Sequence, residues 1–122
     1  MILVDTSVWV DFLHTGLPEL SKLLRESEVL GHPFVQGELA CGNMKNRDEI
    51  LHLISSLTQV PKAEDFEVLE LISNQKLYGH GLTLVDIHLL ASALLANCLI
   101  WTRDKKLVRF ATKLGLHFKE PR

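Results

Sequence analysis

The segment from Thr83 to Leu107, TLVDIHLLASALLANCLIWTRDKKL, constrains the fold more than any other part of the chain. Thr83 is a favourable helix N-cap and Asp86 a favourable acid three residues later, and they begin a long, mostly apolar helical pattern. The run Cys98–Thr102 is short, continuous and apolar, as in a strand buried on both faces, and Asp104 lies just past it. The segment therefore predicts a buried helix and a buried strand, with an acid near each end.

The helical pattern also predicts which way Asp86 faces. At about 100° per residue, Asp86 aligns with Leu90 and Ala93 on the packing side of the helix, whereas His88 and Ser92 form the face expected to meet solvent. Burying an ionised carboxylate costs roughly several kcal/mol unless a positive charge meets it. Two acids in one buried unit therefore point to a cation.

The N-terminus repeats this design, because the apolar run Met1–Val4 ends in Asp5. In open parallel sheets, ligand sites lie at the carboxyl ends of the strands, where Asp5 and Asp104 are both expected. Glu38 falls on the apolar face of a helix expected from Phe34 to about Asn43. The sequence therefore predicts that acids from distant parts of the chain meet.

The remaining segments alternate between short apolar runs and helical patterns. We expect strands at about 1–4, 29–30, 98–102 and 116–119, and helices at about 8–15, 18–24, 34–43, 46–57, 64–77, 83–97 and 105–114. In the helix 64–77, Phe66, Leu69 and Ile72 are predicted to face inward. Strands that alternate with helices favour right-handed crossovers and an α/β fold with a parallel sheet, which we expect to form a single domain over residues 1–122.

Composition restricts the compartment. Cys41 and Cys98, the two cysteines, are too few and too apolar in context for a disulfide framework or a zinc site, and they fit small buried side chains in a reducing cytosol. The N-terminus lacks the basic start of a signal peptide, and no apolar run reaches membrane-spanning length. We therefore expect a cytoplasmic protein without membrane contact.

Charge is distributed unevenly along the chain. Residues 103–122 carry seven Lys or Arg against two acids, whereas residues 1–102 carry six against thirteen. A basic end beside an acidic body suggests that a polyanion approaches one edge of the molecule. A solvated amphipathic helix at residues 105–114 would explain much of the same excess.

Asp5, Glu38, Asp86 and Asp104 together indicate a metal site. Oxygen ligands without accompanying Cys or His favour the hard cations Mg²⁺ or Mn²⁺. Such a cluster suits hydrolysis of phosphodiester bonds, in which one or two ions activate a water and stabilise the leaving oxygen. Each acid alone is better explained as a helix cap or a surface residue, and only the joint pattern favours a metal site.

Each of the four acids lies in a distinctive motif: DTSVW at 5–9, the ELACG segment around Glu38, LVDIHLLASAL from 84, and WTRDKKL ending at 107. Together these motifs resemble the PIN-domain ribonucleases, specifically the VapC-type toxins of bacterial toxin–antitoxin pairs. The resemblance spans residues 1–119 and rests on the order and spacing of the four acids. The helices from Arg47 to Leu77 carry no comparably specific motif.

This resemblance implies a PIN-like, three-layer fold, a twisted and mainly parallel sheet with helices on both faces. It places Asp5, Glu38, Asp86 and Asp104 at the family's catalytic positions, with Asp5, Asp86 and Asp104 as ligands of Mg²⁺ or Mn²⁺. Thr6, Ser7 and Thr102 match hydroxyl positions that hold the acids or the metal-bound water.

The resemblance also implies partners. Members of the family cleave single-stranded or looped RNA, often transfer or ribosomal RNA, are silenced by an antitoxin whose tail covers the acidic pocket, and commonly form homodimers. Lys105, Lys106 and Arg109 then become candidate phosphate contacts for RNA, because they adjoin Asp104 on the basic edge.

Other classes of protein also place acids at strand ends. A receiver-like module would carry adjacent acids after its first strand, and a dehalogenase-like phosphatase an acid two residues after its nucleophilic Asp, whereas Thr6 and Ser7 follow Asp5 here. A Mg²⁺-binding PIN fold that acts as a binding partner or co-repressor without nuclease activity stays open. Trp9 and Trp101 lie in core-like patterns that favour packing over base stacking, and the histidines are expected in surface or capping roles.

Overall fold

The computed structural model describes residues 1–121 and has a parallel sheet at its centre. The strands are β1 (Ile2–Val4), β2 (Val29–Gly31), β3 (Thr58–Gln59) and β4 (Leu99–Trp101), in the order β3-β2-β1-β4. Leu3, at the centre of β1, pairs with Leu30 on one side and Ile100 on the other. The predicted α/β fold with a parallel sheet is confirmed.

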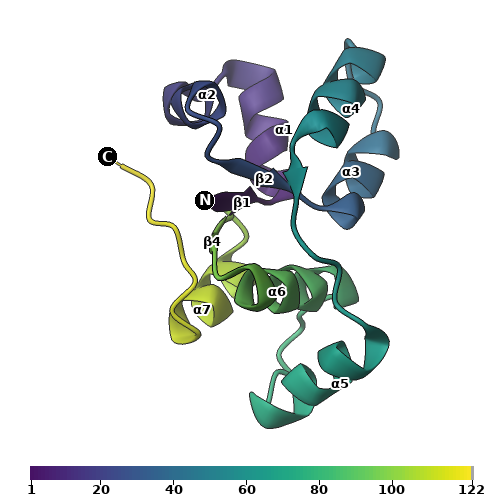
Figure 1. Cartoon of the computed structure of the whole chain (residues 1–122), viewed down its shortest axis with the longest axis vertical. Helices are drawn as coiled ribbons and strands as arrows, with labels where there is room; N and C mark the ends of the chain where they lie inside the picture. The colour runs from purple at the N-terminus through teal and green to yellow at the C-terminus, as the bar shows by residue number, and fades with distance from the viewer. Residues whose placement is uncertain (122) are drawn as a thin grey trace.

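The helices cover both faces of this sheet. They are α1 (Thr6–Thr15), α2 (Pro18–Arg25), α3 (Pro33–Ala40), α4 (Arg47–Ser56), α5 (Asp65–Asn74), α6 (Leu84–Ala96) and α7 (Lys105–Lys113). Figure 1 shows α1 to α4 on one side of the sheet and α6 and α7 on the other, with α5 beyond α6. The three-layer arrangement expected from the resemblance is therefore present.

The core lies between the sheet and these two helix layers. Trp9 of α1 and Trp101 of β4 are each 1% exposed, which confirms that both tryptophans pack in the interior. None of the helices in the described chain is both long enough and apolar enough to cross a bilayer.

The orientation predicted for α6 was wrong. His88 and Ser92, expected to face solvent, are 4% and 0% exposed. Ser92 Oγ lies 3.1 Å from Nε2 of the buried His32, and the His88 ring packs edge-on against Phe34. A helix that packs on the sheet and also against α5 has little surface left for solvent, and its polar side chains find partners that are distant in the sequence.

The inward face predicted for α5 was also wrong. Phe66 and Leu69 are each 64% exposed, and the deeply buried side chain of this helix is Val68, at 2%. The helix carries two overlapping apolar stripes, and the stripe through Val68 and the half-buried Leu71 is the one turned to the core. Cys41, expected to be buried, is exposed, whereas Cys98 is buried as predicted.

The ends of the sheet differ from the prediction in two further ways. The short strand β3 consists of two exposed polar residues, so the apolar pattern of the sequence does not predict it. The strand expected at 116–119 is reduced to one parallel bridge, in which His117 pairs with Ile100. This segment lies where it was expected, but its regular pairing extends over a single bridge.

Candidate active site

Asp5 lies where β1 ends and α1 begins, beside the end of the neighbouring β4. Its backbone N–H donates to the Trp101 carbonyl at 2.9 Å, so the two strand ends are joined directly. Its carboxylate Oδ2 accepts from Ser7 Oγ at 2.8 Å and from Thr102 Oγ1 at 2.7 Å. Asp5 is 7% exposed, and two hydroxyl groups hold its carboxylate in one orientation.

Asp104 begins helix α7, two residues beyond Thr102. Its Oδ1 accepts from the backbone N–H groups of Lys106 and Leu107 at 2.9 and 3.1 Å, and its own N–H donates to Thr102 Oγ1 at 3.1 Å. Thr102 therefore links the Asp5 carboxylate to the backbone of Asp104. The Asp104 side chain is exposed at the positive end of the helix dipole, where an anionic group is stabilised.

Asp86 lies in the first turn of α6 and forms a capping box with Thr83. Asp86 Oδ2 accepts from the Thr83 N–H at 3.0 Å, and the Asp86 N–H donates to Thr83 Oγ1 at 3.1 Å. Burial raises the pKa of Asp86, the charges of Asp104 and Asp5 raise it further, and the hydrogen bonds from Thr83 oppose the rise. The three aspartates therefore lie in one another's electrostatic field.

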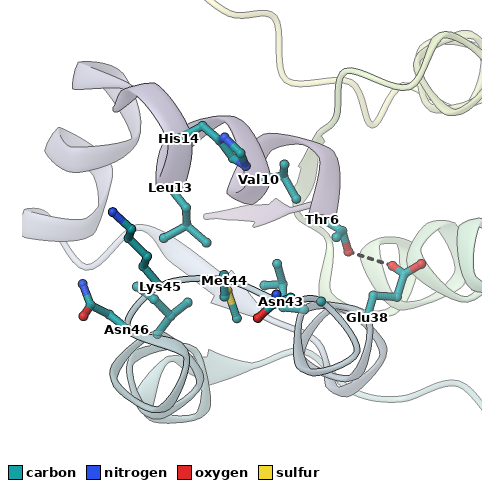
Figure 2. A pocket seen from close by; sticks show the side chains of 12 residues that line it. Thr6, Val10, Leu13, His14, Glu38, Asn43, Met44, Lys45 and Asn46 are labelled. Carbon is teal, nitrogen blue, oxygen red and sulfur yellow. Dashed lines mark hydrogen bonds between the residues drawn. The ribbon is translucent and has the colours of Figure 1, made fainter.

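Glu38 approaches from α3, at the rim rather than in the interior. The sequence pattern placed it on a buried face, but the side chain is exposed. Its Oε1 accepts from Thr6 Oγ1 at 2.7 Å (Figure 2), so the residue directly after Asp5 holds Glu38 rather than Asp5. Its apolar neighbours on the helix, Val35 and Leu39, are buried, whereas the Glu38 side chain reaches the start of α1.

The four carboxylates share one property that suits a cation. Each is held through one oxygen, and within residues 1–121 its other oxygen accepts no hydrogen bond from the protein. In the same described range, no group of three or more carboxylate, imidazole or thiol side chains is gathered closely enough to enclose an ion. Mg²⁺ commonly keeps several waters and takes one or two carboxylates directly, so separated free oxygens fit it.

The basic C-terminal region is partly neutralised by contacts that the sequence did not predict. Arg103 donates to Asp11 at 2.7 Å and to Glu120 at 2.8 and 2.9 Å, and Trp101 Nε1 donates to the same Glu120 at 2.7 Å. These hydrogen bonds from Arg103 lower the pKa of Glu120, with Trp101 adding to the effect. Residue spacing gave no signal for them, because Arg103 and Asp11 are 92 positions apart.

The predicted RNA contacts lie on α7. Lys105, Lys106 and Arg109 are all exposed on this helix, directly after Asp104. The Lys106 amine lies against Gly81, 2.9 Å from where a Cβ on that residue would stand. The Arg109 guanidinium lies 5.2 Å from the centre of the Phe110 ring. These positive charges lie within a turn or two of the acid at the start of the helix.

Comparisons with known proteins agree with this geometry. Residues 2–113 match the PIN domain. The chain is 43% identical over 121 residues, 98% of both sequences, to a protein named Ribonuclease VapC32 from two strains of Mycobacterium tuberculosis. Its fold resembles FitAB bound to an IR36 DNA fragment (TM-score 0.65, 19% identity, all of both chains). It also resembles PAE2754 from Pyrobaculum aerophilum (TM-score 0.59, 17% identity, 93% of this chain and 88% of the other).

Proposed function

Because this chain belongs to the PIN-domain family and, within it, to the VapC-type ribonuclease toxins, we propose that Asp5, Asp86 and Asp104 bind Mg²⁺ or Mn²⁺ for the hydrolysis of RNA. The observation that carries this proposal is the geometry of the acids: Thr102 links the Asp5 carboxylate to the backbone of Asp104, and each aspartate is held through one oxygen only. Burial, with the charges of Asp104 and Asp5 adding to it, also raises the pKa of Asp86. Carboxylates that repel one another are stabilised when a divalent cation binds between them.

The protein's own groups hold the site in shape. Ser7 and Thr102 orient Asp5, the first turn of α7 orients Asp104, and Thr83 orients Asp86. A bound Mg²⁺ or Mn²⁺ would supply an activated water and neutralise charge on the phosphate. Glu38, with a free oxygen at the rim, is proposed to accept a proton from the attacking water.

The substrate is proposed to be single-stranded or looped cellular RNA, with transfer and ribosomal RNA as the leading classes. Lys105, Lys106 and Arg109 would contact its phosphates, because they are exposed cations on the helix that Asp104 begins, whereas the neighbouring Arg103 is paired with Asp11 and Glu120. Reversing the charge of Lys105 and Lys106 should weaken RNA binding and flatten its dependence on salt concentration. An unchanged salt slope would place the RNA elsewhere. We propose the cytoplasm, where such RNA is found, as the location.

VapC-type toxins pair with antitoxins, and we propose that a cognate antitoxin silences this chain by placing an Arg or Lys among the carboxylates. The free carboxylate oxygens support this, since they could accept hydrogen bonds from a guanidinium. Removing that cation from the partner should restore cleavage. We also propose a homodimer, supported by the exposed apolar side chains of α5 and α6.

The deciding experiment is a cleavage assay on structured cellular RNA with Mg²⁺, Mn²⁺ or EDTA. Cleavage should stop in EDTA and return with Mn²⁺. The variant Asp86→Asn should cut at least about 100-fold more slowly, because it removes a proposed ligand. Glu67→Gln is the matched control, since Glu67 also accepts the N-cap N–H of its helix, at 2.9 Å, but lies on α5.

Two results would contradict the proposal. Undiminished cleavage in EDTA would exclude the metal mechanism. Equal losses in Asp86→Asn and Glu67→Gln would mean that Asp86 acts through helix stability alone.

A further inference from the structure

A pocket opens beside Glu38, between α1 and the segment that joins α3 to α4 (Figure 2). It has a volume of about 630 Å³ and shares Thr6 and Glu38 with the acid site. Its apolar lining consists of Val10, Leu13, Leu39, Met44 and Ile50. A space of this size lies within the range of small-molecule sites, roughly 300–1,000 Å³. The pocket is therefore a continuation of the candidate active site, large enough for a ring system.

The polar groups of this pocket are distributed unequally along it. The carboxylate of Glu38 lies at one end, whereas Lys45 and His14 lie toward the other end (Figure 2). Between and beside them, Asn43 and Asn46 contribute side-chain amides. An amide both donates and accepts hydrogen bonds, which is the pattern presented by the edges of nucleobases.

We propose that this pocket receives one unpaired nucleobase of the RNA, next to the bond that is cut. This inference rests on the proposed ribonuclease activity. The base would pack its faces on the apolar side chains, chiefly Met44, and present its edge to Asn43. Lys45 would contact a flanking phosphate. An unpaired base explains why a pocket with both apolar and polar side chains continues from the acids, and it would make the pocket a determinant of sequence preference.

A nucleotide fits this pocket better than an amphipathic helix of a partner protein. Grooves that receive such helices present a continuous apolar stripe to anchors at helical spacing. Here two amides, a cation and an imidazole line the same pocket as the five apolar side chains. The acidic end adjoins the proposed site of hydrolysis, so a strand that places its phosphate there would direct the neighbouring base into the pocket.

The test combines substitutions in the RNA with substitutions in the protein. The probe is a short fluorescein-labelled single-stranded RNA in which each nucleotide in turn is made abasic. Its binding to the full chain is measured by fluorescence anisotropy in the presence of Mg²⁺, and the chain carries Asp104→Asn so that cleavage is slow. One abasic position should weaken binding about tenfold. Adding Met44→Ala should weaken binding of the intact RNA similarly and make the abasic substitution cost nothing further. Leu99→Ala, an exposed apolar residue at the start of β4 and away from the pocket, is the matched control and should change neither value.

The outcomes separate this inference from the proposed activity. If Met44→Ala and the abasic position each weaken RNA binding and their effects multiply when combined, the inference is overturned. It is also overturned if the chain cleaves RNA but every abasic position weakens binding equally. If the wild-type chain cuts no RNA, but one abasic position still weakens binding and Met44→Ala adds nothing to that loss, the pocket binds a base and the proposed hydrolysis is rejected. If Met44→Ala releases a co-purified partner protein and leaves the abasic penalty intact, the pocket is a protein-docking surface and the inference fails.

Discussion

Single carboxylates in this chain serve two purposes at once. Asp104 caps α7 through Oδ1, which accepts from two backbone N–H groups, while its other oxygen accepts no hydrogen bond within the described residues. Asp86 closes a capping box in the same divided way. Because one oxygen orients the side chain and the other accepts no hydrogen bond from the described residues, a substitution can remove the negative charge and still keep the cap.

Asp104 offers the clearest separation of these two purposes. Asn is as good an N-cap as Asp, so Asp104→Asn should change the free energy of unfolding little, because the repulsion that it relieves offsets the helix-dipole interaction that it loses. Asp104→Ala should lower it by about 1 kcal/mol through loss of the cap. Both variants should lose most cleavage and most of the thermal stabilisation that wild type gains on adding Mn²⁺.

Thermal melts with and without Mn²⁺, run beside the cleavage assay, measure all of these effects. Asp104 would be a structural residue only if Asp104→Asn melted far below wild type in both conditions and still cut RNA.

The sequence predicted several of these residues because the patterns that reveal them are local. An apolar run followed by an acid placed Asp5 and Asp104 near strand ends, and Asp5 directly follows β1 whereas Asp104 caps α7 just beyond β4 of the same parallel sheet. The contacts of Arg103 with Asp11 and Glu120, and of Thr6 with Glu38, have no such pattern. They depend on how separate elements pack, which no spacing along the chain encodes.

Among the elements, α6 shows what a helical sequence pattern can and cannot predict. Its start at Thr83 and its apolar character were predictable from capping chemistry and composition, and both are observed. Its solvent face was not, because a His and a Ser look exposed on a helical wheel unless their partners are known. Ser92 is paired with His32, which is the N-cap of α3 and 0% exposed. The polar link between α3 and α6 is therefore a tertiary feature.

The tautomer of His32 follows from its two contacts. The Phe34 N–H donates to Nδ1 at 3.0 Å, so in the neutral ring the proton resides on Nε2, which donates to Ser92 Oγ. Burial, with the charges of His88 and Lys62 adding to it, lowers the pKa of His32 from 6.5 to about 4. Burial also lowers the pKa of His88, whose Nδ1 is buried without a hydrogen-bond partner in the described structure, and Asp65 opposes that shift.

This link predicts how stability depends on pH. In the unfolded chain His32 becomes protonated as the pH falls through 6.5, whereas in the folded chain it stays neutral until about pH 4. The free energy of unfolding therefore decreases as the pH falls between these values. The loss from this group should reach about 2 to 3 kcal/mol at the acid end. Asp86 acts in the opposite sense, because its raised pKa favours proton uptake by the folded chain.

Denaturant unfolding at about pH 7 and pH 4.5 measures this dependence. His32→Gln should flatten the change, and His14→Gln, which removes an exposed imidazole, serves as the control. Equal slopes in wild type and His32→Gln would mean that other groups govern the acid lability.

At the scale of the whole molecule, site and scaffold occupy different regions. Asp5 and Asp104 lie at the carboxyl ends of β1 and β4, whereas α5 lies outside the three layers and packs on α6 (Figure 1). Placing α5 there leaves Phe66 and Leu69 each 64% exposed, and Leu94 and Leu95 of α6 are 43% and 49% exposed. Apolar side chains in such numbers on adjacent helices are typical of a protein–protein interface.

The proposed homodimer can therefore be tested at this surface. Between α5 and α6 runs a groove of about 300 Å³, lined in part by Leu94 and Leu95, which gives an apposed helix a place to seat its side chains. Specific interfaces bury about 1,200–2,000 Å² in total, so a dimer through this surface would have to cover most of the exposed apolar side chains of α5 and α6. Light scattering after size exclusion should give the mass of a dimer for wild type and of a monomer for Leu69→Asp. The reason is that a charge buried without a partner at each copy of the interface outweighs the apolar contact that remains.

Val10→Asp, at an exposed apolar position of α1 on the other side of the sheet, should stay dimeric. A monomeric wild type, or a dimer that survives Leu69→Asp, would remove α5 from the interface and leave its apolar face to another partner.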